Sequence, residues 1–177
     1  MRAKWLWVAA LAAAEAGCGE GRAIFNIDVF SFLSNANADT LPYSGPLPLG
    51  LQDTIPVQTV NSIGIGGASI VDTVRLSGSV DFVNDTGTGN VDFAVYFDTL
   101  KSRVYLGAPA FSVSGAVTPG MTTPSSFDIP DLPTALKPLF LASTVYVGVR
   151  ASVTGAVQGT AKLRALQTRI VIKDKIF

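Results

Sequence analysis

The sequence predicts an all-β protein, an antiparallel β-sandwich of about seven strands joined in part by long Pro-rich loops. Apolar and polar residues alternate with a period of two in several stretches, as in strands with one face in a core and one in water. Clusters of Gly, Asn and Pro separate these stretches at short intervals. Hydrophobic residues make up 48% of the 177-residue chain and charged residues only 15%, which suits a sizeable core. An open β-barrel uses the same alternation and is the alternative architecture.

The first strand is expected at residues 23–33, where alternate apolar side chains can share a face. Residues 34–53 are rich in Asn, Ser, Pro and Gly, and they predict a long surface loop. A short strand is expected at residues 55–60, and the proline within it indicates the edge of a sheet. The closely spaced glycines of residues 64–67 favour a bulge or a turn.

The clearest alternation runs through residues 68–98. In its first part the apolar residues take even positions, namely Ala68, Ile70, Val74, Leu76, Val80 and Phe82. In its last part they take odd positions, namely Val91, Phe93, Val95 and Phe97. The intervening NDTGTGN, residues 84–90, consists of residue types that favour turns. We therefore expect a β-hairpin whose turn lies at residues 84–90.

After a turn at residues 98–102, the sheet is expected to continue through residues 104–117. Residues 118–138 are rich in Pro, Thr and Ser and predict a second long loop. Within it, Asp131 is expected to cap one short helix. The last strands are expected between residues 145 and 173, where apolar and polar residues alternate again. The two long loops are the expected contact arms of the protein, because long ordered loops are usually functional.

The chain begins with two basic residues, Arg2 and Lys4, followed by an apolar run of about ten residues and then by small residues. This order is typical of a secretory signal, and the apolar run is too short to span a bilayer. Residues 1–17 are therefore interpreted as a leader and residues 18–177 as a single extracytoplasmic domain. An uncleaved anchor or interfacial helix is an alternative for the leader.

The only cysteine, Cys18, follows the two small residues Ala16 and Gly17. This stretch resembles the end of the bacterial lipobox, in which the chain is cut before a cysteine that receives a lipid. Glu15 stands where the lipobox family usually has leucine. The resemblance implies a lipoprotein of the bacterial cell envelope, anchored through acyl chains on Cys18, on its periplasmic or other extracytoplasmic face. Ordinary secretion, with Cys18 an incidental small residue, remains the alternative.

The residue types exclude several classes of activity. The chain has no histidine and one cysteine, which excludes an intrachain disulfide, Cys/His zinc sites, haem ligation by histidine and Ser-His-Asp catalysis. We expect no cofactor and no catalytic residue. A hydrolase acting through Asp81, Asp92 and Asp98 is the least favoured hypothesis, because each of them also suits a strand face in solvent.

A candidate calcium site lies in the expected turn of residues 84–90. Asp85, Thr86, Asn90 and Asp92 supply oxygen ligands at short spacing, which calcium prefers. The spacing does not match an EF-hand, and the same residue types favour a plain turn.

Charge is divided unequally along the chain, although the formal net charge is zero. Nine acidic and two basic residues lie between Glu20 and Asp98, whereas three acidic and nine basic residues lie between Thr99 and Phe177. Pairing of strands from the two parts would bring opposite charges together. Otherwise one face would be acidic and one basic. Ordinary solvated strand edges explain such charges, and a basic edge that faces lipid headgroups or an acidic partner is the alternative. Nucleic acid is not an expected partner.

Together these features predict a non-catalytic, membrane-tethered binding or structural protein. One form is an extrinsic accessory subunit that braces a larger membrane complex, for instance a respiratory or photosynthetic one, and a protein partner in the cell envelope is expected. The alternative is a carrier of a small apolar ligand or lipid, held between the sheets.

Overall fold

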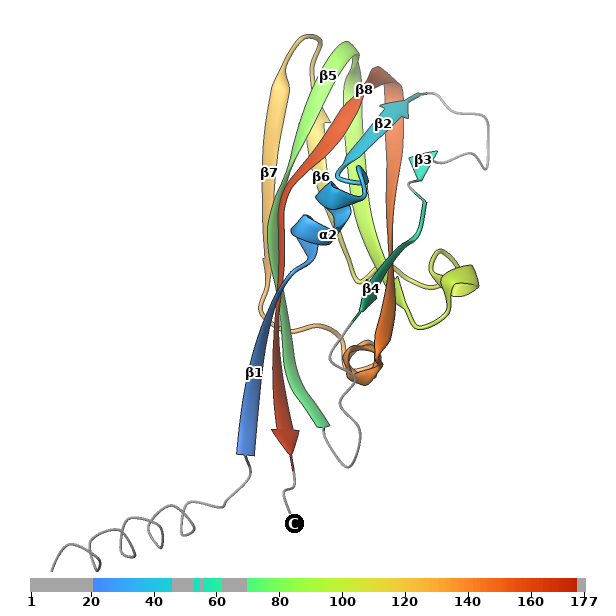
Figure 1. Ribbon diagram of the computed structural model, residues 1–177. Helices are drawn as coiled ribbons and strands as arrows, with labels where there is room; N and C mark the ends of the chain where they lie inside the picture. Colours follow the sequence, from blue (N-terminus) through green and yellow to red (C-terminus); the bar gives the residue numbers. More distant parts are fainter. Residues whose placement is uncertain (1–20, 46–52, 55, 62–69, 175–177) are drawn as a thin grey trace, which may run out of the picture.

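The computed structural model describes residues 21–45, 53–54, 56–61 and 70–174, and these form an antiparallel β-sandwich (Figure 1). The prediction of an all-β sandwich is confirmed. Eight strands belong to one hydrogen-bonded sheet. The elements are β1 (Gly21–Asp28), α2 (Val29–Asn35), β2 (Thr40–Ser44), β3 (Asp53–Thr54), β4 (Gln58–Asn61), β5 (Ile70–Asp98), η1 (Lys101–Arg103), β6 (Phe111–Val117), β7 (Thr122–Ile129), η2 (Lys137–Leu141) and β8 (Thr144–Asp174). None of the helices among these residues has the length and apolar character that crossing a membrane requires.

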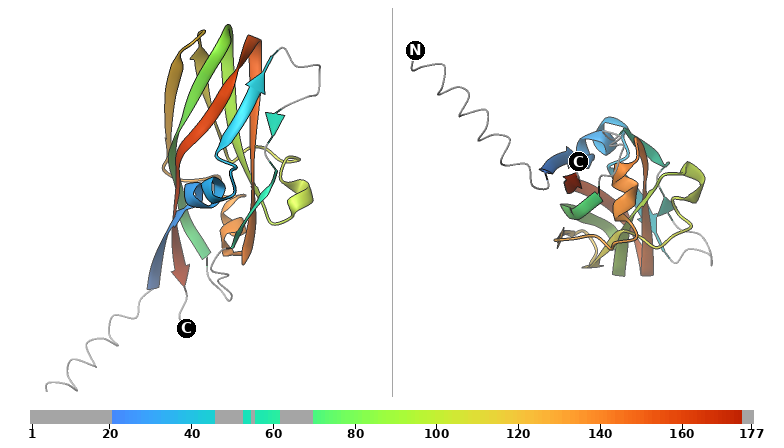
Figure 2. Two further views of the ribbon diagram at one scale, coloured as in Figure 1. Left: turned by 45° about the horizontal axis from the view of Figure 1, so that its top comes forward. Right: turned by 90° about the horizontal axis from the view of Figure 1, so that it is seen from below.

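Two long strands form the centre of the sheet. β5 has 29 residues and β8 has 31, and they pair from Ile70 opposite Lys173 to Asp98 opposite Tyr146. Both strands bend together at the end of the molecule that is uppermost in Figure 1, and then run back (Figures 1 and 2). The sandwich is therefore a single ribbon of strands folded over on itself.

The shorter strands extend this ribbon on both edges. The bend divides the sandwich into two layers. Layer one contains the first part of β5 and the C-terminal part of β8, and layer two contains the last part of β5 and the first part of β8. In layer one, β1 and β2 flank β8, and β7 flanks β5. In layer two, β3 and β4 flank the first part of β8, and β6 flanks the last part of β5. We call the bend between the layers the fold line, which comprises Gly45, residues 84–90, residues 118–121 and residues 155–159. Three glycines with positive φ lie on the fold line: Gly87, Gly120 and Gly155.

The predicted hairpin at residues 84–90 is wrong. β5 does not pair with itself, and residues 84–90 stay paired with β8 across the fold line. The switch of apolar residues from even to odd positions comes instead from a β-bulge, because Asn84 lies opposite Gly159, Thr86 lies opposite Gln158, and Asp85 is skipped. One extra residue moves the following side chains to the other parity, so the inward face is kept.

Two more bulges have the same effect. In the pairing of β5 with β8, the extra residues are Asp72 in β5 and Arg164 in β8, which have no residue opposite them. The bulge at Asp72 explains why Ile70 is 59% exposed and Val71 is buried, contrary to the predicted inward position of Ile70.

The core lies between the layers and is filled by large side chains. Those that are fully buried include Leu33, Tyr43, Leu76, Phe82, Phe93, Leu166 and Ile172. Helix α2 covers one open side of the sandwich through Val29 and Leu33, and η2 contributes Phe140, whose ring contacts that of Phe97 with centroids 5.5 Å apart. The alternation of apolar and polar residues in the sequence therefore corresponds to the alternation of side chains that face the core and side chains that face solvent.

Three further expectations about local structure are corrected. The first strand ends at Asp28, because its carboxylate accepts hydrogen bonds from the backbone and hydroxyl of Ser31 and starts α2. β2 lies within the first expected Pro-rich loop and β7 within the second, so these segments are not loose contact arms. Both are edge strands, which tolerate proline, so a Pro-rich composition that is typical of loops is also compatible with these strands. The strand expected at residues 55–60 is confirmed as β4, and residues 64–67 lie outside the described residues.

Segment 104–106, expected as strand, instead packs on the outer face of layer two. There the guanidinium of Arg150 lies 5.1 Å from the ring centroid of Tyr96 and 4.9 Å from that of Tyr105. The Tyr105 hydroxyl donates to the carbonyl of Val149 and accepts from its N–H, both at 3.1 Å. Val149 needs these bonds because β3 pairs only up to Arg150 and β4 only from Val147, which leaves a gap in the ladder between them.

The variant Tyr105→Phe is expected to lower the free energy of unfolding by about 1–3 kcal/mol, because two backbone groups of Val149 lose their partner. Urea unfolding followed by circular dichroism measures this. Tyr146→Phe is the matched control, since Tyr146 belongs to the same cluster and its hydroxyl bonds to no described residue. Equal losses in the two variants would contradict the role of the Tyr105 hydroxyl.

Candidate functional site

The residues singled out from the sequence do not converge on one site. Cys18 lies outside the described residues. Asp85, Thr86 and Asn90 are exposed along the bent part of β5, and Asp92 lies farther along it and accepts a hydrogen bond from the Ser114 hydroxyl. They occupy a paired strand, not a loop that could wrap an ion. The described residues hold no group of three or more acidic, histidine or cysteine side chains placed to bind a metal.

The three aspartates of the hydrolase hypothesis are also separated. Asp81 lies in layer one and forms an ion pair with Arg164, with 2.7 Å between Oδ2 and Nε. Asp92 and Asp98 follow the fold line and belong to layer two, where Asp98 accepts from the backbone of Leu100 at 2.8 Å. Buried residues flank Asp81 and Asp92 on both sides, so Asp81 points outward from one layer and Asp92 from the other. No carboxylate pair of the kind that glycosidases use forms between them.

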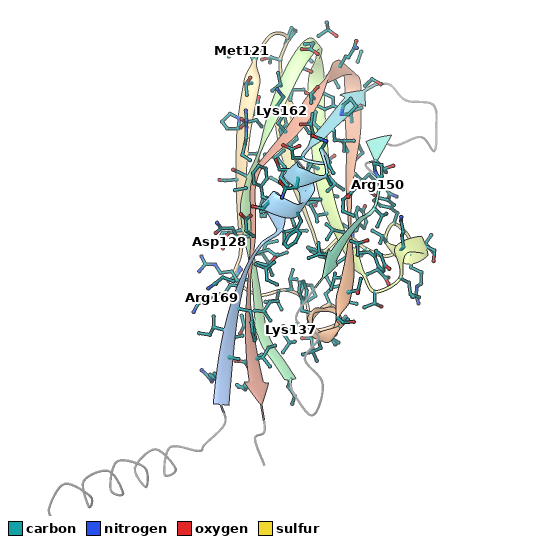
Figure 3. All side chains as sticks on the ribbon, in the orientation of Figure 1. Met121, Asp128, Lys137, Arg150, Lys162 and Arg169 are labelled. Atoms are coloured by element: carbon teal, nitrogen blue, oxygen red, sulfur yellow. The ribbon has the colours of Figure 1, made fainter. Side chains whose placement is uncertain are left out.

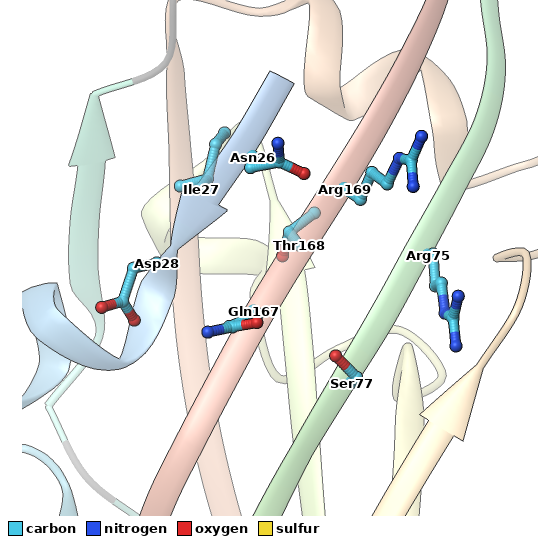
Figure 4. Close-up of a pocket in the computed structure, with 8 residues that line it drawn as sticks. All are labelled: Asn26, Ile27, Asp28, Arg75, Ser77, Gln167, Thr168 and Arg169. Atoms are coloured by element: carbon cyan, nitrogen blue, oxygen red, sulfur yellow. The ribbon is translucent and has the colours of Figure 1, made fainter. Parts of the chain in front are cut away.

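A pocket of about 310 Å³ lies instead on the outer face of layer one, where β1 ends and α2 begins (Figure 4). Strand β1, the C-terminal part of β8 and the first part of β5 position its walls side by side. It is lined by Asn26, Ile27, Asp28, Arg75, Ser77, Gln167, Thr168 and Arg169. We call it the Arg169 pocket.

Charge in the Arg169 pocket is unevenly compensated. Arg75 and Arg169 are direct cross-strand neighbours, an arrangement that destabilises a sheet when both charges are free. Arg75 is compensated by Asp128, to which it donates at 2.8 Å and 2.5 Å. The side-chain hydrogen bond from Arg75 lowers the pKa of Asp128, and the same bond raises the pKa of Arg75. The side chain of Arg169 is exposed and makes no hydrogen bond or ion pair with another described residue.

The remaining polar groups suit recognition more than catalysis. Asn26 lies opposite Arg169, and Asp28 and Ser77 both lie opposite Gln167. The Asp28 carboxylate is occupied by Ser31, and Figure 4 shows it on the other side of the pocket from the two guanidinium groups. Amide, hydroxyl and guanidinium donors therefore surround the unpaired charge of Arg169. Such a set can hold an anionic oxygen group such as a phosphate or a carboxylate.

The interior offers little room for the apolar ligand of the carrier hypothesis. A pocket that opens between the layers beside η2 has a volume of only about 20 Å³ and is lined by Ile27, Val29, Val60, Phe97, Phe140, Val145, Val147 and Thr168. Ligand pockets are commonly of about 300–1,000 Å³. A further groove of about 300 Å³ lies on the surface between the α2–β2 and β3–β4 segments.

Sequence reasoning did not find the Arg169 pocket. Asn26 and Asp28 lie in the first expected strand, residues 23–33, and Arg169 lies in the basic C-terminal part of the chain, about 140 residues away, with no motif that links them. Only the pairing of β1 with β8 and of β8 with β5 brings these residues to one place. The signal present in the sequence was the alternation, because each of these polar residues stands next to residues that pack into the core and therefore points outward.

Comparisons with known proteins do not assign the chain. No protein-family model and no curated protein matches it. Among solved structures it is similar to that of infectious bursal disease virus Gx strain, with 11% identity and a TM-score of 0.43 over 89% of this chain. It is also similar to a chain of the disulfide-linked pili of Bacillus endospore appendages, with 15% identity and a TM-score of 0.23 over 70% of this chain and 86% of that one. The match covers only 33% of the viral chain. Likenesses this low say nothing about what the chain binds.

Proposed function

We propose that the protein is a non-catalytic lipoprotein of the bacterial cell envelope, held on the extracytoplasmic face of a membrane through Cys18. Its sandwich would bind or brace another component of the envelope, as an extrinsic accessory subunit does. The observation that carries the proposal is the place where the sandwich begins. β1 starts at Gly21, three residues after Cys18, so the anchor lies within at most about 11 Å of the first strand.

The position of β1 in the fold supports this proposal. β1 starts at the end of the sandwich opposite the fold line, beside the C-terminal end of β8 and the start of β5 (Figure 1). A lipid on Cys18 would therefore tether one end of an elongated sandwich and leave the fold line at the opposite end. Met121, which is 58% exposed, lies at that distant end (Figure 3).

Mass spectrometry of the chain isolated from bacterial membranes tests the anchor. We expect a mature chain that begins at Cys18 and carries the mass of more than one acyl chain, the condition for stable anchoring. Cys18→Ala is expected to lose the acyl mass and the cut before position 18. Glu15→Leu, which installs the usual leucine of the lipobox, is expected to raise the processed fraction. A native chain with a free thiol at Cys18 would refute the anchor.

Purification of the native chain in mild detergent tests the binding role. We expect a stoichiometric envelope protein to copurify with it. A chain that is recovered alone under conditions that preserve other membrane complexes would argue against an accessory subunit.

A further inference from the structure

The outer face of layer one combines basic and apolar side chains at the end where β1 begins. Three neighbouring strands present them in register: Arg22 opposite Lys173, Ile24 opposite Val171, and Asn26 opposite Arg169, with Ile70 and Arg75 on β5 beside Lys173 and Arg169. We call this surface the basic face; its residues are Arg22, Ile24, Asn26, Ile70, Arg75, Arg169, Val171 and Lys173.

The two isoleucines of the basic face are unusually exposed to solvent. Ile24 is 52% exposed and Ile70 is 59% exposed, although residues of this type are generally buried. Ile70 points away from the core because the next residue, Val71, is buried between the layers. Ile24 does so because it lies opposite Val171, whose neighbours Ile170 and Ile172 are both buried. Arg22 and Lys173 lie in the same row as Ile70, so apolar side chains are mixed with cations.

The cations of the basic face are only partly compensated within the molecule. Lys173 Nζ lies 3.0 Å from Oδ1 of Asp72, and Arg75 is paired with Asp128. Arg22 and Arg169 make no ion pair with a described residue. Mixed exposed isoleucines and unpaired arginines fit the boundary between the headgroups and the acyl chains of an anionic bilayer, where apolar groups enter and cations meet phosphates.

We propose that the basic face lies on an anionic lipid surface, with a headgroup phosphate held in the Arg169 pocket. The phosphate would supply the negative charge that Arg169 lacks beside Arg75, and the amides of Asn26 and Gln167 would donate to its oxygens. The orientation of the molecule rests on the proposed lipid anchor at Cys18, which would keep this face within reach of the membrane. The charge complementarity does not depend on the anchor.

The Arg169 pocket can contact the lipid headgroups only if the long axis of the sandwich leans toward the membrane surface. Asn26, opposite Arg169, lies five residues from the start of β1, or about 17 Å along the strand. In an upright molecule the headgroup layer, about 5–8 Å thick, would reach Arg22 and Lys173 but not Arg169. The exposed isoleucines point outward from the face and not along the strands, so only a leaning molecule buries them. Arg169 therefore distinguishes the leaning from the upright orientation.

Flotation with lipid vesicles tests the proposal. Residues 18–177 carrying Cys18→Ala are used, so that neither acylation nor the apolar and basic leader contributes to binding. Partition into vesicles containing phosphatidylglycerol is compared with partition into phosphatidylcholine vesicles. We expect preference for the anionic vesicles and a loss of this preference at high salt. Arg169→Gln is expected to weaken partition about five-fold, and Arg22→Gln with Arg169→Gln about twenty-five-fold.

The matched control is the double variant Lys101→Gln with Arg103→Gln. These two exposed cations lie in η1, beyond layer two, and their loss changes the net charge equally. Partition of this control is expected to stay as in the parent chain. Equal weakening in both double variants would mean that net charge alone attracts the protein, and an unchanged Arg169→Gln would mean an upright molecule. Either result overturns the proposal, whether or not Cys18 proves to be acylated in cells. Melting temperatures equal to that of the parent chain show that the exposed variants fold.

Discussion

Gly87→Ala is expected to lower the free energy of unfolding by about 4 kcal/mol, whereas Gly120→Ala costs about 1 kcal/mol. Both glycines lie on the fold line and have similar positive φ values, 77° and 69°. They differ in their surroundings. A Cβ at position 87 would lie 1.6 Å from the carbonyl oxygen of Ala156, while one at position 120 would meet nothing within 4 Å. The first variant must therefore separate β5 from β8, and the second adds only the strain of a left-handed alanine.

The variant Gly89→Ala distinguishes the effect of the close approach of the strands from the effect of a positive φ. Gly89 has no positive φ, yet its Cβ would lie 2.0 Å from the carbonyl oxygen of Thr154. We expect a loss of about 3 kcal/mol, larger than at position 120. Urea unfolding of the three variants measures the series. Equal losses for Gly87→Ala and Gly120→Ala would contradict the inference that β5 and β8 approach too closely at Gly87 to admit a side chain.

Asp131→Ala is expected to destabilise the protein by about 1–3 kcal/mol, because the N–H of Val74 and the ammonium group of Lys137 lose their acceptor. The Asp131 carboxylate accepts from the N–H of Val74 at 3.0 Å and from Nζ of Lys137 at 2.6 Å. Lys137, whose side chain is only 12% exposed, also donates to the carbonyl of Asp72 at 2.7 Å. β7 ends at Ile129, so Asp131 and Lys137 continue its role along β5, where the bulge at Asp72 interrupts the ladder.

This arrangement also corrects a prediction, since Asp131 does not cap a helix. The residue before η2 is Leu136, and no side chain caps η2. Asp131 bonds across to β5 instead, which sequence spacing could not reveal because Val74 is 57 residues away.

A pH dependence follows from the same contacts. The hydrogen bond from Lys137, and then that from Val74, lower the pKa of Asp131 below its ordinary value of 3.8. A carboxyl with a lowered pKa in the folded state stabilises the fold above its ordinary value, and this stability is lost as the pH falls through the lower, folded value. The difference in stability between the parent chain and Asp131→Asn should therefore be constant near neutral pH and shrink below about pH 3.8. Asp131→Asn keeps an acceptor for Val74 and should cost less than Asp131→Ala. A difference that grows on acidification would contradict this assignment.

The unequal division of charge along the chain is largely resolved by strand pairing. β5 carries acidic residues and β8 basic ones, and their pairing brings Asp81 to Arg164 and Asp72 to Lys173. This is the compensation expected if strands from the two parts pair. The charge of Arg169 is not compensated, because its neighbour on β5 is another cation, Arg75, and Asp128 forms its ion pair with Arg75. The outcome depended on register, since a shift of two residues would give Arg169 a different neighbour on the same face.

The sequence by itself determined most of the side chains that face the core, because alternation is a local property of a strand, although it placed Ile70 inward where the structure exposes it. Even its changes of parity were meaningful, since each marks a bulge: Asp72, Asp85 and Arg164. Only the tertiary structure decided that β5 continues through NDTGTGN, that β2 and β7 are strands, and that Arg169 meets Asn26 and Arg75. Those outcomes depend on hydrogen bonds between residues far apart in the chain, and a turn-like composition is compatible both with a hairpin and with a bend in a paired ribbon. The physical reason is that inward and outward positions repeat every two residues, whereas the choice of partner strand is a property of the whole sheet.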